Sequence, residues 1–291
     1  MVNMNDELKQ KLIAEINKSG FSHEIDIIQR LRAEELIVFP NLAYLDVEDK
    51  PHEIDAYVGF TNYDEEKSLD EVALNLIVEC KSSSDKPWVF FDDSEDALAI
   101  LGLVDRMVCF SDFEMKDTLT PLAGCMNTAL RGHHYNDSTI PVARTHLEAF
   151  GKDSGKEIYQ GITSLWYAID YFKRLFAKST HNRTPQNKRI SFIHPVIIFK
   201  GVMVAARKNN DDFEIEEVPH VILRTIDCIT DKELDFRVAS KEIIVDVIRN
   251  DFLENYIQIC RNDLRLCMAH IEQLFKAGWI VRDTNNVSSN T

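Results

Sequence analysis

Helical periodicity marks the start of the chain. Apolar residues recur every three to four positions over residues 6–17, and a Ser-Gly pair then ends the pattern, so a first helix is predicted there. A second helix is predicted from Ser22, a residue type that caps helix starts, to about Leu36. Its predicted buried face consists of Ile27, Ile28 and Leu31.

Short apolar segments that are typical of strands follow the two helices. Leu74–Cys80 is nearly continuous in apolar residues, as expected for a central strand covered on both faces. Further strands are predicted at Ile37–Phe39, Ala43–Val47, Glu53–Phe60, Phe192–Ala206 and Glu214–Leu223. Trp88, Phe90 and Phe91 form another apolar segment, which we expect to pack in the core rather than to stack on a base.

Longer amphipathic patterns occupy the later part of the chain. They predict helices at Asp93–Val104, Lys156–Ala177 and Lys241–Phe275. The candidates for the buried side of the last helix are Ile244, Ile248, Phe252, Tyr256, Ile259 and Leu266. Together the patterns predict an α/β fold of three layers, in which helices flank a central mixed β-sheet and a helical segment ends the chain.

The composition is that of a globular protein. Of the 291 residues, 45% are hydrophobic and 28% are charged, enough for a large core. No apolar run approaches the roughly 18 residues of a membrane helix, so we expect no membrane contact. The chain starts with polar and acidic residues, and the spacing of its six cysteines indicates neither a zinc site nor a disulfide framework. We therefore expect a cytoplasmic protein.

The net charge of −15 argues against general binding to nucleic acid. The charge is uneven, however, because residues 1–100 carry 9 Lys and Arg against 23 Asp and Glu, whereas residues 171–210 carry nine basic residues and no acid. The basic stretch is either a local site for a polyanion or a solvated helix end and loop, and both interpretations stay open. As a nucleic-acid site it would act through Lys173, Arg174, Lys178, Arg183, Lys188 and Arg189.

Two acids and a lysine stand on two of the predicted strands. Glu79 and Lys81 flank Cys80 at the end of the central strand, and Asp55 lies within the strand before it. Because side chains alternate along a strand, Glu79 and Lys81 are predicted to share one face while Cys80 points into the opposite layer. Charged groups at the end of a buried strand are costly without a partner. A surface ion pair between Glu79 and Lys81 is the alternative interpretation.

A divalent cation would supply that partner. Asp55 and Glu79 offer hard oxygen ligands, the backbone carbonyl of Cys80 offers a third, and Mg²⁺ or Mn²⁺ accepts such a set. Lys81 would then orient an attacking water or stabilise developing charge. Glu24 lies near the start of the second helix and shares its apolar stripe, so we expect it to face the sheet as a fourth member of the site. Its alternative role is to complement the helix macrodipole.

Short motifs surround these residues, namely Gly20-Phe21-x-x-Glu24, Glu53-Ile54-Asp55, Val78-Glu79-Cys80-Lys81-Ser82-Ser83 and Lys86-Pro87-Trp88. With them the chain resembles the PD-(D/E)xK nuclease superfamily and its restriction-endonuclease-like fold. The resemblance covers residues 19–91 and continues weakly to a later helix, where Gln160 and Tyr167 would be accessory site residues. The proline-aspartate pair of the superfamily is not intact, because Pro51 stands four residues before Asp55.

We expect a nuclease-like α/β domain over residues 1–225, followed by a helical C-terminal segment over residues 226–291. The resemblance itself accounts for no part of the chain beyond about residue 210. It implies Mg²⁺- or Mn²⁺-dependent hydrolysis of phosphodiester bonds, most directly in DNA, with RNA not excluded. Asp55, Glu79 and the Cys80 carbonyl would be the metal ligands and Glu24 an accessory ligand. Lys81 would be the catalytic lysine.

A binding or assembly module without catalysis is the alternative function. It would act through a homodimer of the C-terminal helices, or through a basic protein partner of the acidic residues 1–100. His133 and His134 could bind a metal or a phosphate, but a polar loop is the preferred interpretation of this pair. The sequence has no Walker loop, GxGxxG, GxSxG or HExxH motif, so several other enzyme classes lack their usual marks.

Overall fold

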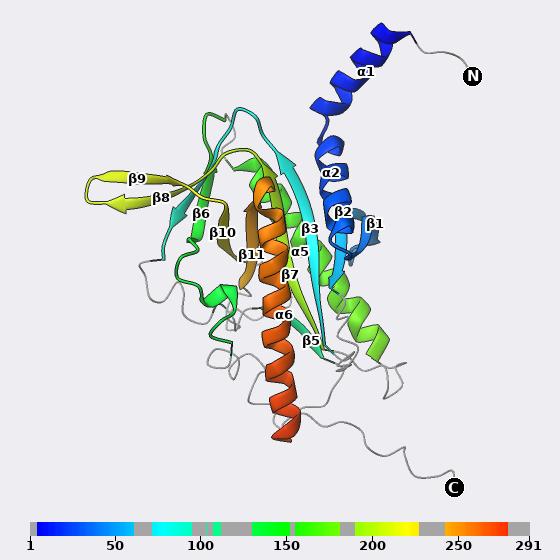
Figure 1. Cartoon of the computed structure of the whole chain (residues 1–291), viewed down its shortest axis with the longest axis vertical. Coiled ribbons are helices and arrows are strands. Elements are labelled where there is room, and N and C mark those ends of the chain that lie inside the picture. The colour runs from blue at the N-terminus through cyan, green and yellow to red at the C-terminus, as the bar shows by residue number, and fades with distance from the viewer. Residues whose placement is uncertain are drawn as a thin grey trace.

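A large mixed β-sheet organises the chain in the computed structural model, which describes residues 5–60, 72–94, 103, 107–111, 130–151, 155–180, 190–226 and 242–278. Within these residues the sheet has eleven strands in the order β1-β2-β3-β7-β11-β10-β6-β4-β8-β9, and β5 also pairs with β7 (Figure 1). The strands are β1 (Ile37–Leu45), β2 (Pro51–Phe60), β3 (Val72–Ser82), β4 (Trp88–Asp92), β5 (Val108–Ser111), β6 (Val142–Glu148), β7 (Ile190–Lys200), β8 (Met203–Asn209), β9 (Asp212–Glu217), β10 (His220–Ile226) and β11 (Glu242–Arg249).

Helices cover both faces of this sheet. They are α1 (Asp6–Lys18), α2 (Gly20–Ala33), α5 (Lys156–Thr180) and α6 (Leu253–Lys276), with short 3₁₀ turns at η2 (His134–Asn136) and η4 (Asn250–Phe252). Residues of α2 and α6 share one hydrophobic core with one face of β3, and α5 packs in a second core on the other face. In Figure 1, α6 lies in front of the sheet and α5 behind it, while α1 extends away from the body. The predicted α/β class with helices flanking a mixed sheet is confirmed.

Strand β3 is central to the half of the sheet that carries the candidate site. It pairs with β2 in the antiparallel sense and with β7 in the parallel sense, the latter from Val72 to Ser82. Val78 and Cys80 belong to the core with α2 and α6, whereas Ile77 belongs to the core with α5. The alternation predicted for this strand is therefore confirmed, because it sends Glu79 and Lys81 toward α5.

Several predicted core residues lie where the patterns indicated. Ile27, Ile28 and Leu31 of α2 are buried, although this helix begins at Gly20 rather than at Ser22, with Ser19 at its N-cap position. Trp88 and Phe90 are fully buried, and the Trp88 ring stacks on Phe199 with 3.9 Å between the ring centroids. Trp88 and Phe90 are part of the core, as expected, whereas Phe91 is only half-buried and contacts Phe213.

The predicted helix over residues 241–275 is wrong in its first third. Residues 242–249 form strand β11, which lies inside the sheet between β7 and β10, and the helix α6 begins only at Leu253. Ile244 and Ile248 are spaced as on a helix face, but the run from Ile243 to Ile248 is rich in β-branched residues, which favour strands. The sheet therefore continues beyond residue 225, where the helical segment was expected to begin.

The strand predictions differ from the structure in their boundaries. The two short segments at 37–39 and 43–47 form the single strand β1. The segment at 192–206 is divided at Gly201 into β7 and β8, and the segment at 214–223 is divided into β9 and β10. Apolar pattern alone does not mark these breaks, because the residues on both sides of each turn are still strand formers.

Some predictions fall wholly or mainly outside the described residues. They include most of the predicted helix 93–104, and Arg183, Lys188 and Arg189. The four cysteines in the described part of the chain are free thiols, and three of them, Cys80, Cys260 and Cys267, are buried. Of the helices that the structure describes, none is long and apolar enough to cross a membrane.

Gly201 is expected to be intolerant of any side chain. A Cβ atom there would lie 2.5 Å from the Phe199 ring and 2.6 Å from the Ser83 backbone oxygen. Gly201→Ala should lower the free energy of unfolding by roughly 1–3 kcal/mol, as overpacking does, measured by urea denaturation. Gly59→Ala is the matched control, because its Cβ would meet its nearest neighbour at an ordinary 3.5 Å. Equal stability of the two variants would contradict this account of the β7–β8 turn.

Candidate functional site

The structure brings Asp55, Glu79 and Lys81 together at one end of β3. The Lys81 ammonium donates a hydrogen bond to Glu79 Oε2 at 2.8 Å, and the two side chains share the face that α5 covers. Asp55 Oδ2 accepts a hydrogen bond from the Cys80 backbone N–H at 2.6 Å. Three residues singled out from the sequence thus lie in one polar group, with both carboxylates held by specific donors.

A local break in strand β2 turns Asp55 toward β3. Ile54 packs in the core on the α5 side, whereas Ala56 packs in the core on the side of α2 and α6. Residues two apart in a regular strand share a face, so the alternation is interrupted around Asp55. The pairing of β2 with β3 ends at Ala56, and in β1 the residue facing the break is Asn41, which has a positive φ of 49°.

Helix α5 completes the site from the other side. A Cβ at Gly161 would lie 3.1 Å from Ile197 and 3.5 Å from the Lys81 side chain, so the helix passes close to β3 and β7 here. One turn later, the Ser164 hydroxyl donates a hydrogen bond to Glu79 Oε1 at 2.6 Å. Both oxygens of Glu79 are therefore held, one by Ser164 and one by Lys81.

Sequence reasoning missed Ser164 and named two other residues of the same helix. Tyr167 stacks on His52, with ring centroids 4.3 Å apart. Gln160 is exposed and lines a separate hollow of about 530 Å³ with Lys86 and Glu148, among others. Neither forms a hydrogen bond with Asp55 or Glu79 in the described part of the chain. Ser164 lies between them, and its position three residues after Gly161, on the sheet-facing side of the helix, is the signal that could have identified it.

Glu24 faces the site from α2. Its side chain is half-buried, and its charge interacts with those of Asp55 and Lys81. Burial raises the pKa of the Glu24 carboxyl, and the nearby Asp55 carboxylate raises it further. The predicted inward orientation of this helix position is confirmed, and the group contains three acids for one lysine.

Burial also changes the protonation of the other two acids. The pKa of Glu79 is raised to about 7, because its carboxyl is desolvated and lies near Asp55, and Lys81 only partly offsets this effect. Burial likewise raises the pKa of Asp55, and the hydrogen bond from the Cys80 backbone N–H, which lowers this pKa, does not cancel the effect. For Lys81, burial acts to lower the pKa, but the Glu79 carboxylate outweighs it and raises the pKa. The site therefore carries excess negative charge that a proton or a metal cation would neutralise.

The donor types suit a hard divalent cation, but the oxygens of Glu24, Asp55 and Glu79 do not all lie within 4.8 Å of one another. Carboxylate oxygens of Asp55, Glu79 and Glu24 are the ligand type that Mg²⁺ and Mn²⁺ prefer. Asp55 Oδ1 has no hydrogen-bond partner among the described residues, and a carboxylate oxygen that accepts one hydrogen bond keeps a second lone pair. The Cys80 carbonyl lies in the chain between Glu79 and Lys81, so it remains part of the candidate ligand set.

The basic stretch is described only at its beginning. Lys173 and Arg174 lie on α5, 12 residues or more after Gly161, which corresponds to about 18 Å along a helix. The Arg174 guanidinium donates to Asp170 and to the Leu45 carbonyl oxygen, so part of its charge is already compensated. Nothing is described of the Lys178 side chain or of the basic residues at 183–189.

A second polar group lies elsewhere, at His133 and His134. Both side chains are buried rather than placed in a polar loop, so that interpretation was wrong. His134 contacts two buried carboxylates, Asp246 of β11 and Asp263 of α6. The sequence did not link these residues, because 112 and 129 positions separate His134 from the two acids.

Comparison with known proteins adds no relative: no family model, no curated protein and no solved structure matches the chain.

Glu79→Gln should stabilise the metal-free protein in a pH-dependent manner. Because the pKa of Glu79 is raised, the folded state holds this proton more tightly than the unfolded chain, and the associated stability is lost as pH rises from about 4.5 to about 7. The amide of the variant is neutral at every pH, so the variant does not lose this stability as the pH rises. The free energy of unfolding of the variant should therefore exceed that of wild type by roughly 1–3 kcal/mol at pH 8 and be close to that of wild type at pH 5.

Urea denaturation at both pH values, in EDTA, measures this difference. Glu216→Gln is the matched control, because Glu216 is an exposed residue of β9. A gain in stability from Glu79→Gln that is equal at pH 5 and pH 8 would contradict the assigned pKa shift.

Proposed function

We propose that the chain is a metal-dependent phosphodiesterase of the PD-(D/E)xK type that hydrolyses DNA. The observation that carries this proposal is the meeting of Asp55, Glu79 and Lys81 at the end of β3, with excess negative charge and with Glu24 beside them. The segment that resembles the superfamily contains α2 and β1 to β4, and the central position of β3 supports a restriction-endonuclease-like core.

The carboxylates of Asp55 and Glu79 would hold a Mg²⁺ or Mn²⁺ ion, with Glu24 as an accessory ligand. When bound, such an ion polarises a phosphate oxygen and lowers the pKa of a bound water. The Cys80 N–H orients Asp55, and Ser164 orients Glu79 through their hydrogen bonds. These donors keep the two carboxylates in place before any ligand arrives, so little reorganisation is needed on binding.

Lys81 has the role of a positively charged group beside the reacting phosphate. Its ammonium shares a face with Glu79 and stays protonated, since Glu79 raises its pKa. It would orient the attacking water or neutralise the additional charge of the transition state. Contacts to the phosphate backbone are proposed for the basic stretch that begins at Lys173, and these would fix position without reading sequence.

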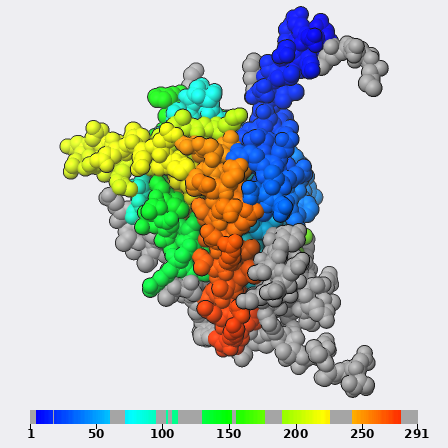
Figure 2. All heavy atoms as spheres, in the orientation of Figure 1, coloured from blue at the N-terminus to red at the C-terminus, as the bar shows by residue number. Residues whose placement is uncertain are grey.

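An assembly module is the second candidate function, and helix α1 is the observation that favours it. Four large apolar residues on α1 are exposed: Leu8, Leu12, Ile13 and Ile16. The helix projects beyond the body of the molecule (Figure 2). The proposed dimer through the C-terminal helix has less support, because the apolar side of α6 is already buried against the sheet.

Replacement of Lys81 or of Asp55 should strongly reduce DNA cleavage. We expect supercoiled plasmid to be nicked or linearised in Mg²⁺ or Mn²⁺ and to stay intact in EDTA. Lys81→Ala and Asp55→Asn should each lower the rate by about 100-fold or more, as expected for groups that stabilise a transition state. Lys276→Ala, at an exposed lysine of α6, is the matched control. Single-stranded RNA is the parallel substrate that tests the alternative nucleic acid.

Intact plasmid and RNA with every metal, from protein whose fold is verified by circular dichroism, would contradict the proposal. Concentration-dependent assembly in sedimentation, lost when Leu12 and Ile16 are replaced by Ser, would then support the second candidate function.

Ser164 is expected to be a positioning residue that acts through Glu79. Its hydrogen bond lowers the pKa of Glu79, so Ser164→Ala should shift the acid limb of the pH–rate profile to higher pH. The rate at neutral pH should fall about 5- to 10-fold, in line with the loss of one hydrogen bond. Thr163→Ala is the matched control, because the Thr163 hydroxyl donates to the Tyr159 carbonyl of its own helix and to no other residue that the structure describes. An unshifted limb would contradict this role.

A further inference from the structure

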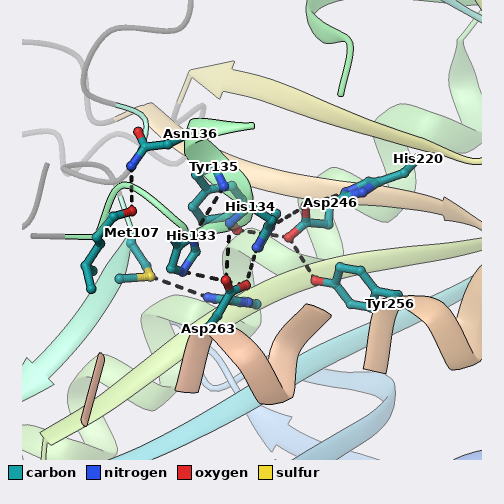
Figure 3. A network of polar contacts seen from close by, with 11 residues as sticks. Met107, His133, His134, Tyr135, Asn136, His220, Asp246, Tyr256 and Asp263 are labelled. Carbon is teal, nitrogen blue, oxygen red and sulfur yellow. Dashed lines mark hydrogen bonds and ion pairs between the residues drawn. The ribbon is translucent and has the colours of Figure 1, made fainter. Parts of the chain in front are cut away.

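Buried imidazoles and carboxylates form a connected network under α6, apart from the candidate active site (Figure 3). His134 lies at its centre, between Asp246 and Asp263, and each of these three side chains is at most 3% exposed. The surrounding members are His133, Tyr135, His194, His220 and Tyr256. The members of the network, Asp246 and Asp263 included, come from η2 and the residue before it, from β7, β10 and β11, and from α6. The network therefore joins elements that are distant in the sequence.

Three donor atoms converge within this network. Asp246 Oδ1 lies 2.8 Å from His220 Nε2 and 3.1 Å from His134 Nε2, and all three atoms lie within 4.8 Å of one another. In a tetrahedral zinc site with ligands at about 2.0–2.1 Å, donor atoms are roughly 3.3 Å apart. Two of the three separations, 2.8 and 3.1 Å, are close to this value, and the third is at most 4.8 Å.

The neighbouring groups are arranged as the partners of metal ligands are. His134 Nδ1 contacts Asp263 Oδ2, which orients the ring and leaves Nε2 directed at Asp246. The other oxygen of Asp246 accepts hydrogen bonds from the Tyr135 and Tyr256 hydroxyls, at 2.9 and 2.8 Å. A carboxylate behind a ligating histidine is the usual partner in metal sites, because it fixes the tautomer of the ring.

The charge of the network also favours a cation. Asp246 and Asp263 are both buried, and among the described residues their partners are histidines, tyrosines and a backbone N–H, not a lysine or an arginine. A divalent ion would balance both carboxylates. The Nδ1 atom of His220 has no hydrogen-bond partner in the described part of the chain, so this ring is held in the network through Nε2 alone.

A surface hollow borders one of the three residues whose donor atoms converge, His220, but is not lined by His134 or Asp246. It has a volume of about 510 Å³, and His220 is part of its lining. Acidic residues predominate among the charged residues of the lining: Asp92, Asp137, Glu214, Glu216 and Glu217, with Arg207 as the basic one. Such a lining attracts cations toward His220.

We propose that His134 Nε2, His220 Nε2 and Asp246 Oδ1 bind a divalent transition-metal ion of the Zn²⁺ kind. Asp263, Tyr135 and Tyr256 position these ligands. Two imidazole nitrogens and one carboxylate oxygen suit Zn²⁺ better than Mg²⁺, which prefers oxygen ligands. With three protein ligands the ion would keep one position for a further ligand. It would join η2 with the strands β10 and β11, and with α6 through Asp263.

This proposal is tested by measuring zinc binding to a variant that lacks the carboxylates of Asp55 and Glu79. The full-length Asp55→Asn/Glu79→Gln double variant, freed of metal, would be titrated with ZnCl₂ by calorimetry, with MgCl₂ in parallel. We expect one saturable Zn²⁺ per chain and no comparable binding of Mg²⁺. Because metal binding rather than cleavage is measured, failure here is distinct from failure of the proposed nuclease function.

Ligand and partner variants in the same background assign the site. His220→Gln should weaken Zn²⁺ binding by at least about 100-fold, and Asp263→Asn by about 10- to 100-fold, as expected for a carboxylate that orients a ligating histidine. His270→Gln is the matched control, because His270 is a buried histidine of α6 with no hydrogen-bond partner for either ring nitrogen among the described residues. It should leave the affinity unchanged.

Nitrogen NMR of the histidine rings in the double variant gives a readout that does not depend on the folding of further variants. Zn²⁺ should change the ring signals of two histidines at stoichiometric addition. The proposal is overturned if no saturable Zn²⁺ binding occurs, or if His220→Gln binds Zn²⁺ as tightly as His270→Gln. In that outcome the network is held by a protonated His134 between two carboxylates, with no metal.

Discussion

The parallel pairing of β3 with β7 is the constraint on which the rest of this half of the structure depends. It extends over all eleven residues of β3, while β2 pairs with the other edge from Leu74 to Val78, and each face of the strand packs in a hydrophobic core. A strand in that position cannot shift by one residue without exchanging its two faces. The pairing therefore determines that Glu79 and Lys81 meet α5 and that Cys80 meets α2 and α6.

The group of Asp55, Glu79 and Lys81 and the network around His134 both contain carboxylates that are buried away from water. Asp55 and Glu79 are held by hydrogen bonds at the end of β3. Asp246 of β11 accepts hydrogen bonds from the Tyr135 and Tyr256 hydroxyls and contacts the Nε2 atoms of His134 and His220. Buried carboxylates of this kind reduce stability unless they gain a counter-charge. The first group has a lysine that is partly exposed to solvent, whereas His134 and Asp246 of the second group are almost fully buried.

Much of the first group could be predicted from local sequence, and little of the second. Glu79 and Lys81 are two positions apart on one strand, so alternation alone places them together. Glu24 follows from helical spacing. Ser164 and the contact of Asp55 with the Cys80 N–H depend on how α5 crosses β3 and on the break in β2, which no local pattern records. His134, Asp246 and Asp263 meet only because β11 enters the sheet beside β7.

By itself, the sequence determined the α/β class and the central strand with its two faces, and it named candidate residues for binding a hard cation. These features are local, because they depend on periods of two and of about 3.6 residues. Only the tertiary structure decided that residues 242–249 form a strand, since the periodicity of their apolar run fits a buried helix turn as well as a buried strand, and their β-branched residues only favour the strand. It also decided which distant side chains share a donor or a charge, because burial and distance between segments are properties of the packed chain.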